Sequence, residues 1–404
     1  MPSMIDFDDA QHRFAHTFAA PDASMRIPLA QAVGRVLAAP VAATLDQPPA
    51  DQSAMDGYAV RHAEVAPAAT LRIQQRCYAG DVPLALAPGC ATRIFTGSLI
   101  PEGADTVIIQ EHAREAEGNV AFDAPGRLGT HIRRRGEDAR AGQTLIPAGV
   151  RLQPAHVGLV AAQGIQAVDV FPVPRVGILT TGDELVPPGQ HREPQQIYNS
   201  NAPMLAALVS GMGATVAHVE HAGDNRRAIE HALRELRSRC DLIISVGGAS
   251  VGEKDLVRPT LTSLGASFEI AGVNMRPGKP VALGQLDGMP VVLLPGNPGA
   301  ALTTFTLLVS PLIRCLQGRA ERLPATPSLP VDLDAAPDDA RDRFLRVRCD
   351  ATAQGLPLLA TLSHQGSGAM HALVQASGFV RLAAGRPITP GSAVPYYDLA
   401  HWLA

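Results

Sequence analysis

A loop at 245–255, with the sequence SVGGASVGEKD, combines residues that suit an anion-binding loop with negatively charged side chains. Its first eight residues hold three glycines, two serines and no charged side chain, and backbone N–H groups in such loops bind phosphate oxygens. The loop then ends in Glu253, Lys254 and Asp255, and a carboxylate repels a phosphate. Either the loop is an ordinary turn, or a positive ion lies between the phosphate and the acids.

Three more polar loops adjoin predicted strands: TTGDEL (180–185), RPGKP (276–280) and LPGNPGAA (294–301). In an open α/β sheet, ligands bind outside the carboxyl ends of the strands. Each loop alone is more simply explained by tight turns, and Asn297 would be a helix N-cap with Pro298 at the first helical position. Their coincidence at one rim favours an anion site. No Walker A motif and no G-x-G-x-x-G after a strand occurs in the chain.

Alternating strands and helices must position these loops. Near-continuous apolar strands separated by amphipathic helices predict a parallel, doubly wound α/β domain over 172–322. The predicted strands are 175–181, 214–221, 241–246, 267–273, 280–286 and 290–295.

The flanking regions have a different character. Helices are predicted at 6–18, 28–38 and 153–163, the last closed by Gly164. Short apolar runs broken by Gly and Pro predict an all-β region over 57–150. A Pro-rich linker is expected at 323–332, before further short strands.

The composition excludes several classes. The 404 residues carry a net charge of −4, so a nucleic acid is not expected as partner. No apolar run approaches the roughly 18 residues of a membrane span, and no signal pattern is evident, so the expected location is cytoplasmic. The five cysteines are scattered, and the thirteen histidines show no convincing metal-ligand spacing.

Lysine is rare in this chain. Of 34 basic residues only Lys254 and Lys279 are lysines, and both lie in glycine-rich loops. A compact ammonium differs from a planar guanidinium, so these two positions are candidates for sites that require lysine. The alternative is that these two lysines were retained by chance in a chain biased toward arginine.

Eight stretches together carry a resemblance. The chain resembles the molybdopterin molybdenumtransferase family, which includes bacterial MoeA and the E domain of gephyrin. SAMDGYA and the GGxSxGExD loop are the most specific of the motifs, and together the motifs spread over about three quarters of the chain. The stretches are PPADQSAMDGYAV (48–60), FTGSLIPEGADTVI (95–108), IRRRGEDARAG (132–142), GILTTGDELV (177–186), IYNSNAPML (197–205), DLIISVGGASVGEKD (241–255), RPGKPVALG (276–284) and LLPGNPGAALTTF (293–305).

The resemblance implies a multidomain α/β and β protein with an elongated, L-shaped subunit. Its doubly wound molybdopterin-binding domain would be accompanied by β-rich domains, and a homodimer would place each active site between that domain of one subunit and the SAMDGYA region of the other. The implied domains are 1–50 completed by 139–171 (domain I), 51–138 (β-rich domain II), 172–322 (domain III) and 323–404 (a C-terminal β-barrel, domain IV).

The implied reaction inserts molybdenum from molybdate into adenylylated molybdopterin and releases AMP, with Mg²⁺ or Zn²⁺. Two alternatives remain open: a molybdopterin adenylyltransferase, which lacks the extra β domains, and a non-catalytic molybdopterin-binding scaffold. The expected partners are the small-molecule substrates, a second copy of the chain and, transiently, a molybdopterin adenylyltransferase. A membrane partner is not expected.

Several site residues have a structural alternative. Asp56 is expected near molybdate or metal, although Asp-Gly also favours a turn. Thr96 and Ser98 flank a glycine and could hold an oxyanion or cap a turn. In the run at 133–138, Arg133 and Asp138 are favoured, because a guanidinium fork suits tetrahedral oxyanions, while an arginine run is usually a solvated face.

Hard oxygen ligands for Mg²⁺ are expected from carboxylates. Asp224 could instead be the N-cap of a helix at 225–239, and Asp183 could cap a helix. Arg276 stands where the family often has lysine, and Ser367 in HQGSGAM matches only loosely. The predicted catalytic residues are Asp56, Asp138, Glu184, Asp255 and Lys279, and the predicted metal ligands are Asp183, Glu184, Asp224 and Asp255. The predicted substrate-binding residues are Thr96, Ser98, Arg133, Thr181, Gly182, Gly247, Gly248, Ser250, Arg276, Pro295, Gly296, Asn297 and Ser367.

Overall fold

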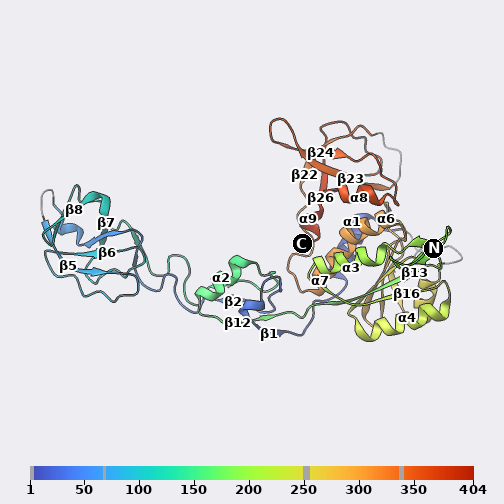
Figure 1. Ribbon diagram of the computed structural model, residues 1–404, viewed down its shortest axis with the longest axis horizontal. Coiled ribbons are helices and arrows are strands. Elements are labelled where there is room, and N and C mark those ends of the chain that lie inside the picture. The colour runs from blue at the N-terminus through green and yellow to red at the C-terminus, as the bar shows by residue number, and fades with distance from the viewer. Residues whose placement is uncertain (1–3, 67–69, 249–254, 336–340) are drawn as a thin grey trace. The chain divides into compact units, whose positions relative to one another are not determined.

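The computed structural model describes residues 4–66, 70–248, 255–335 and 341–404 (Figure 1). The chain forms two compact units. The first unit comprises Met1–Ala39, Ala148–Pro154 and Ala167–Ala404, and the second comprises Pro40–Pro147 and Ala155–Gln166. Each unit is described by itself below.

A six-stranded sheet forms the centre of the first unit, in the order β16-β13-β17-β21-β20-β18. All six strands predicted for this region are present. The pairs β13–β16, β13–β17 and β17–β21 are parallel, as predicted. The strands are β13 (Arg175–Thr181), β16 (Thr215–Ala222), β17 (Leu242–Val246), β18 (Ser267–Ile270), β20 (Ala282–Leu286) and β21 (Met289–Leu294).

The sheet is mixed rather than wholly parallel, which corrects the prediction. Strand β20 pairs antiparallel with both β21 and β18. Only Asp287 and Gly288 separate β20 from β21, with φ angles of 48° and 84°. Two residues with positive φ form a hairpin turn, whereas parallel strands need a long crossover, so this connection dictates an antiparallel pair.

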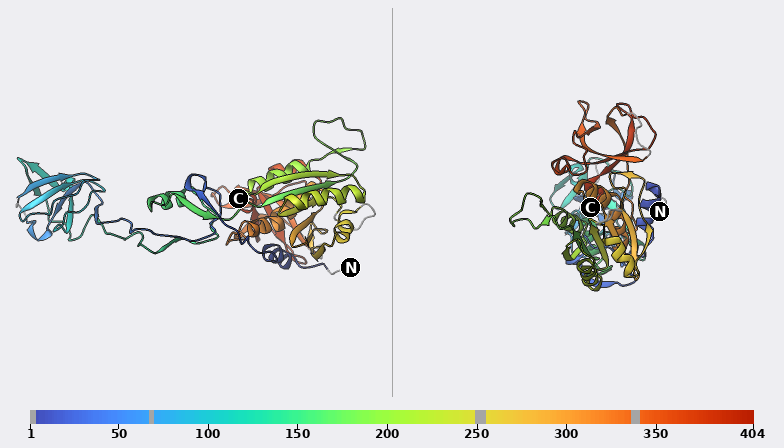
Figure 2. Two further views of the ribbon diagram at one scale, coloured as in Figure 1. Left: turned by 90° about the horizontal axis from the view of Figure 1, so that it is seen from below. Right: turned by 90° about the vertical axis from the view of Figure 1, so that its right-hand side faces the viewer.

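Helices cover both faces of this sheet (Figure 2). In β17, Ile244 packs with Leu205 of α3 in one buried cluster, and its neighbour Ile243 packs with Leu233 of α4 in another. Successive strand residues point to opposite faces, so the continuous apolar strands reflect burial on both sides. The helices are α1 (Phe7–His16), α3 (Asn201–Gly211), α6 (Pro298–Thr304) and α7 (Ser310–Leu316) on the first cluster, and α4 (Arg226–Arg239) and α5 (Val257–Ser263) on the second.

One helical segment is apolar and long enough to cross a membrane. It runs through α6, the π-helical turn η4 (Phe305–Val309) and α7, covers 19 residues and has a mean hydropathy of 1.5. Because 94% of it is buried inside the protein, it is the central helix of the core.

The start of the chain corrects one prediction and confirms another. Helix α1 lies within the predicted range of 6–18. At 28–38, however, only the short 3-10 helix η1 (Leu29–Gln31) forms, because the chain turns at Gly34 with a φ of 81°. The preceding β1 (Met25–Pro28) pairs antiparallel with β12 (Ala167–Val170).

The C-terminal part of the first unit is a small barrel. Its strands run in the order β19-β23-β24-β22-β26-β25, and an additional pairing of β23 with β25 closes the ring. Strand β22 lies in the segment predicted as a linker, because its Val331 is fully buried in the barrel core. The elements are β19 (Met275–Arg276), β22 (Ser328–Asp332), β23 (Asp342–Ala351), β24 (Pro357–Thr361), α8 (Met370–Gln375), β25 (Gly378–Leu382), β26 (Ala393–Asp398) and α9 (Leu399–Trp402).

The second unit is mainly β-structure, as predicted for 57–150. Its largest sheet has the order β7-β4-β6-β5-β9-β8, and its core gathers around Tyr58, Val60 and Ile108. Helix α2 (Pro154–Ala162) forms as predicted and ends before Gly164, whose φ is 73°. The strands are β2 (Val41–Ala42), β3 (Gln52–Ser53), β4 (Gly57–Val60), β5 (Thr70–Cys77), β6 (Cys90–Ile94), β7 (Thr106–Ile109), β8 (Ala113–Ala116), β9 (Asn119–Phe122), β10 (Ile132–Arg133) and β11 (Thr144–Ile146).

Candidate functional site

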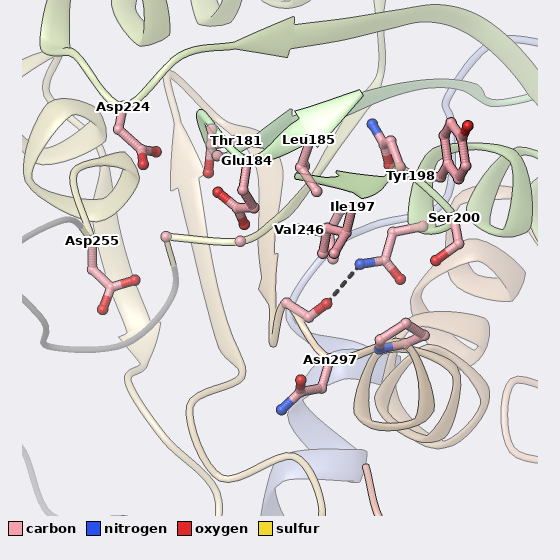
Figure 3. A pocket seen from close by; sticks show the side chains of 17 residues that line it. Thr181, Glu184, Leu185, Ile197, Tyr198, Ser200, Asp224, Val246, Asp255 and Asn297 are labelled. Carbon is pink, nitrogen blue, oxygen red and sulfur yellow. Dashed lines mark hydrogen bonds between the residues drawn. The ribbon is translucent and has the colours of Figure 1, made fainter. Parts of the chain in front are cut away.

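A cavity of about 460 Å³ opens in the first unit where β13, β17 and β21 end (Figure 3). Three of the four polar loops identified in the sequence border it, which is the position expected for a ligand site in an open α/β sheet. Its lining consists of Thr181, Gly182, Glu184, Leu185, Ile197, Tyr198, Asn199, Ser200, Asn201, Asp224, Val246, Gly247, Gly248, Asp255, Gly296, Asn297 and Pro298.

Glycine is required where the first two loops approach each other. Gly247 has a φ of 92°, and a Cβ there would lie 2.8 Å from the carbonyl oxygen of Thr181. A side chain at this position would therefore separate the ends of β13 and β17. The predicted residue Ser250, in the same loop, lies outside the described residues.

Three carboxylates line this cavity from different parts of the chain. Glu184 follows β13, Asp224 follows β16 and Asp255 precedes α5 (Figure 3). Asp183 is not among the lining residues, and its Oδ1 accepts a 3.0 Å hydrogen bond from the backbone N–H of Asp224. Asp183 thus holds the Asp224 segment beside the cavity.

Asp224 is not a helix cap, so the structural alternative raised for it is wrong. The N-cap of α4 is Asn225, whose side chain accepts a 2.9 Å hydrogen bond from the backbone N–H of Ala228. Helix capping is thus done by the neighbouring residue, and it does not explain the carboxylate of Asp224. The cap suggested for Asp183 also fails, because the short strand β14 (Leu185–Val186) follows it.

The carboxylates suit a metal ion that arrives with a phosphate. Within the described ranges, no group of three or more His, Cys, Asp or Glu side chains is placed to hold a metal ion by itself. Mg²⁺ usually takes one or two protein carboxylates and completes its shell with phosphate oxygens and water. Glu184, Asp224 and Asp255 around one cavity fit that donor set.

Two asparagines that the site prediction omitted hold the cavity together. Asn199 donates to the Thr180 hydroxyl at 3.0 Å and accepts from the backbone N–H of Ala202 at 3.1 Å. Asn201 donates to the carbonyl oxygen of Gly296 at 2.7 Å, which joins α3 to the loop before α6. Both belong to the motif IYNSNAPML, so this motif could have identified them as site residues from the sequence.

The same motif supplies an apolar wall. Ile197 and Tyr198 line the cavity and are 54% and 48% exposed. Large apolar side chains at a cavity suit the flat ring of a ligand, because small-molecule sites combine an apolar lining with a few polar groups.

The N-terminus of α6 contacts the C-terminal barrel. Pro298 is at the first helical position as expected, and the N-cap Asn297 makes no side-chain hydrogen bond to the helix and lines the cavity. The backbone N–H of Gly299 donates to the carbonyl oxygen of Ser367 at 2.7 Å. Ser367 is therefore brought to the helix that borders the cavity, although it is not itself a lining residue.

A buried arginine, absent from the predicted site, holds the loop of Ser367. Arg346 is 2% exposed and donates to the carbonyl oxygens of His364 at 2.6 Å and Gly366 at 3.0 Å. Burial lowers the pKa of Arg346 from its usual value. No sequence motif distinguishes this arginine from its neighbours Arg343 and Arg348.

Besides Asp183 and Ser367, three more predicted residues of the first unit do not line the cavity. Arg276, in β19, and Lys279 are exposed, whereas Pro295 is buried at the end of β21. Strand β19 pairs with β23, so the loop RPGKP begins at the barrel side of the first unit.

In the second unit, two hydrogen bonds join Asp56 to Thr96. Asp56 Oδ1 accepts hydrogen bonds from the backbone N–H of Thr96 at 2.8 Å and from its hydroxyl at 2.9 Å. The backbone N–H bond is the main reason that the pKa of Asp56 is lowered. Gly57 is the first residue of β4, between β6 and β7, so a turn does not explain the Asp-Gly pair.

Ser98 is placed differently from the prediction. The residue is fully buried, and its hydroxyl donates to the carbonyl oxygen of Cys77 at 2.9 Å. A buried hydroxyl committed to a backbone carbonyl is not available to an oxyanion. The structure therefore argues against Ser98 as a substrate-binding residue, and its hydroxyl joins two distant segments instead of capping a local turn.

The arginine run at 133–135 divides into two kinds of residue. Arg134 and Arg135 pair with Asp51 and Asp46, at 2.7 and 2.6 Å. Arg133, Glu137 and Asp138 instead border a second cavity, of about 740 Å³. Its lining consists of Leu45, Gln47, Pro48, Pro49, Gln52, Arg133, Glu137, Asp138 and Ala162.

Comparison with known proteins identifies three successive family matches. Residues 5–164 match the family described as MoeA N-terminal region (domain I and II). Residues 177–315 match the family described as probable molybdopterin binding domain, and residues 329–399 match MoeA C-terminal region (domain IV).

Curated relatives and solved structures agree with these matches. A molybdopterin molybdenumtransferase of Haemophilus influenzae is 32% identical over 99% of this chain and 100% of its own length. Another, from Nostoc sp., is 41% identical over 71% of this chain and 68% of its own length. The structure of a molybdopterin biosynthesis moea protein from Pyrococcus horikosii has a TM-score of 0.80 at 28% identity, covering 98% of this chain and 99% of that one. The chain therefore belongs to the MoeA family of molybdopterin molybdenumtransferases.

Proposed function

We propose that this protein inserts molybdenum from molybdate into adenylylated molybdopterin, releases AMP and so forms the molybdenum cofactor. Membership of the MoeA family supports this proposal, since curated members are named molybdopterin molybdenumtransferase. The observation that carries it furthest is the meeting of glycine-rich loops with Glu184, Asp224 and Asp255 around one cavity. Such a cavity suits a phosphoanhydride together with a divalent cation.

Within this proposal, the loops of the cavity bind the pyrophosphate of the substrate. Thr181, Gly182, Gly247, Gly248, Gly296 and Asn297 line it, and loop backbone N–H groups suit phosphate oxygens. Ile197 and Tyr198 would contact a ring of the substrate. When bound, Mg²⁺ or Zn²⁺ would neutralise phosphate charge and make the phosphoanhydride easier to cleave.

Carboxylates of both units have roles in the proposed reaction. Glu184 and Asp255 would hold the metal ion at the phosphoanhydride, with Asp224 beside them and Asp183 fixing the backbone of Asp224. Asp56 would orient molybdate, or the water that attacks the adenylyl phosphorus, through the arrangement that it makes with Thr96.

The remaining candidate residues carry positive charge or neutral hydrogen-bonding groups. Arg133, with Asp138, would hold molybdate in the second cavity before transfer, since a guanidinium fork matches a tetrahedral oxyanion. Lys279 and Arg276 are both exposed and would contact substrate anions through their positive charges. Ser250, Pro295 and Ser367 remain proposed contacts of the substrate.

We also propose a cytoplasmic homodimer, in which the cavity of one subunit and the SAMDGYA region of the other form the active site. Transient transfer of the substrate from a molybdopterin adenylyltransferase belongs to the same proposal. The domain limits that we propose are 1–50 with 139–171, 51–138, 172–322 and 323–404.

The experiment measures AMP released from adenylylated molybdopterin, with and without molybdate and Mg²⁺. We expect release that depends on both, and a loss of release when EDTA removes the divalent ion. AMP release that does not depend on molybdate would contradict the proposal. Formation of the adenylate from molybdopterin and ATP would indicate an adenylyltransferase instead, and inactivity with retained molybdopterin binding would indicate a scaffold.

A further inference from the structure

Two histidine side chains stack on the exposed face of α1. The rings of His12 and His16 have their centroids 4.3 Å apart and an interplanar angle of 24°. They are four residues apart in a helix, so they occupy the same face in successive turns. Both residues are exposed, and neither belongs to the two cavities described above.

The orientation of His16 is set by a backbone group. Its Nδ1 lies 2.9 Å from the carbonyl oxygen of His12. A carbonyl oxygen only accepts, so Nδ1 carries the hydrogen, and the lone pair of the neutral ring is on Nε2. Histidines that ligate metals are commonly oriented in this way, by a hydrogen bond from the other ring nitrogen to a carbonyl.

The helix that carries the two rings is firmly held. Its opposite face buries Phe7, Ala10 and Phe14 in the core of the first unit. Beside the pair, the hydroxyl of Thr17 donates to Glu269 of β18 at 3.0 Å. The spacing of the two imidazoles is therefore supported by tertiary contacts and does not depend on the stability of an isolated helix.

We propose that His12 and His16 together bind a divalent transition-metal ion. The stacked rings bring the two side chains close together, with centroids 4.3 Å apart. Rotation of the rings would turn both lone pairs toward one ion, and two metal–imidazole bonds of about 2.1 Å at a tetrahedral angle place their nitrogens about 3.4 Å apart. Two histidines at i and i+4 on one helix face are an established arrangement for such ions. Imidazole favours Zn²⁺, Cu²⁺ and Ni²⁺ over Mg²⁺, which separates this site from the carboxylate cavity.

Water is expected to complete the coordination shell. Asp9 precedes His12 by three residues on the same helix face, but no three such side chains in the described part of the chain converge on one point. The proposal therefore rests on the two imidazoles and predicts weaker binding than at a closed four-ligand zinc site.

The test is a titration of the whole protein with Zn²⁺ in the presence of millimolar Mg²⁺. Binding is measured by calorimetry and by NMR of the histidine rings. We expect one ion per chain, with the signal change of His16 at Nε2. His12→Gln and His16→Gln are each expected to raise the Kd at least about tenfold, since even loss of a partner that only orients a ligand costs 10–100-fold. His231→Gln is the matched control, because His231 is exposed on α4 and has no histidine three or four residues away.

Two outcomes would overturn the proposal. One is zinc binding in both single variants at the affinity of the unchanged protein, and the other is zinc binding that His231→Gln weakens equally. An unchanged far-ultraviolet circular dichroism spectrum and unfolding temperature show that the variants fold. AMP release is expected to be unaffected in all three variants, which keeps this test independent of the proposed function.

Discussion

The backbone N–H of Gly299 donates a 2.7 Å hydrogen bond to the carbonyl oxygen of Ser367. This contact joins the N-terminal turn of α6, which borders the cavity, to a loop of the C-terminal barrel. Arg346 also holds that loop, by donating to the carbonyl oxygens of His364 and Gly366. The barrel therefore contributes to the geometry of the site without lining the cavity.

Gly299→Ala is expected to disturb this contact. A Cβ at position 299 would lie 2.6 Å from the carbonyl oxygen of Ser367 and 2.8 Å from Arg346 Nη1, both parts of the packed structure. We expect a loss of stability of about 1–3 kcal/mol from overpacking. AMP release is expected to fall by up to about 100-fold, because displacements near 1 Å have such effects on reacting groups.

The control for this variant is Gly366→Ala, in the same loop, where a Cβ meets no atom within 4 Å. It is expected to leave the unfolding temperature and AMP release nearly unchanged. Equal effects of the two substitutions would contradict the role given to the contact between α6 and the barrel.

Asp56→Ala is expected to remove activity and leave the fold intact. The carboxylate accepts two hydrogen bonds from Thr96, and the first of them is the main cause of its lowered pKa. The lowered pKa means that the carboxylate of Asp56 is held in its charged form more firmly than that of an ordinary aspartate. Loss of a preorganised charged group is expected to lower AMP release on the order of 100-fold.

The measurement compares AMP release by Asp56→Ala and by Asp81→Ala. Asp81 is an exposed carboxylate of the same unit that also accepts from a backbone N–H, that of Tyr78. Activity close to normal in the Asp56 variant, or an equal loss in both variants, would remove Asp56 from the proposed site.

Ser98→Ala separates a structural serine from a substrate-binding one. The Ser98 hydroxyl is buried and donates to the carbonyl oxygen of Cys77 at 2.9 Å. Its removal leaves that buried carbonyl without this donor and is expected to cost about 1–3 kcal/mol of stability. AMP release per folded molecule should stay unchanged at a temperature well below unfolding, and a raised KM at unchanged stability would reverse the assignment.

The Arg175–Asp241 pair is expected to make stability depend on pH. Burial raises the pKa of Asp241, but hydrogen bonds from the side chain and backbone of Arg175 outweigh it, and the net shift is downward. A lowered pKa in the folded state stabilises the protein above the unfolded value of about 3.9, and this stability is lost as the pH falls through the folded pKa.

Asp241→Asn is therefore expected to destabilise the protein at pH 7 and to have a smaller effect at a pH below the unfolded value of about 3.9. Because the two side chains are 55% and 42% exposed, solvent screening limits the effect to about 0.5–1 kcal/mol. Denaturant unfolding at both pH values checks this. Asp350→Asn is the control and should lower stability less at pH 7, because the Asp350 carboxylate accepts from the side chain of Arg348, whereas Asp241 accepts from both the side chain and the backbone N–H of Arg175.

Much of the first unit follows from local pattern. Strand β13 occupies the predicted range, 175–181, because both faces of a central strand are buried and its apolar run is continuous. The carboxyl ends of parallel strands meet at one edge, so the loops at 180–185, 245–255, 276–280 and 294–301 were expected to share a site. Three of them border the cavity, and 276–280 does not. The direction of β20 was missed, although the Asp287-Gly288 turn was visible in the sequence.

The sequence by itself determined the family, the order of strands and helices in the α/β domain and the loops that border the cavity, because motifs and periodicity are local properties of the chain. Only the tertiary structure decided that Ser98 is buried against Cys77, that Asn225 rather than Asp224 caps α4, and that Arg346 holds the barrel loop against α6. It also closed the barrel, through the pairing of β23 with β25. Such choices depend on contacts between residues far apart in the sequence or on which of two adjacent side-chain acceptors has the right backbone geometry, and neither is encoded in a local pattern.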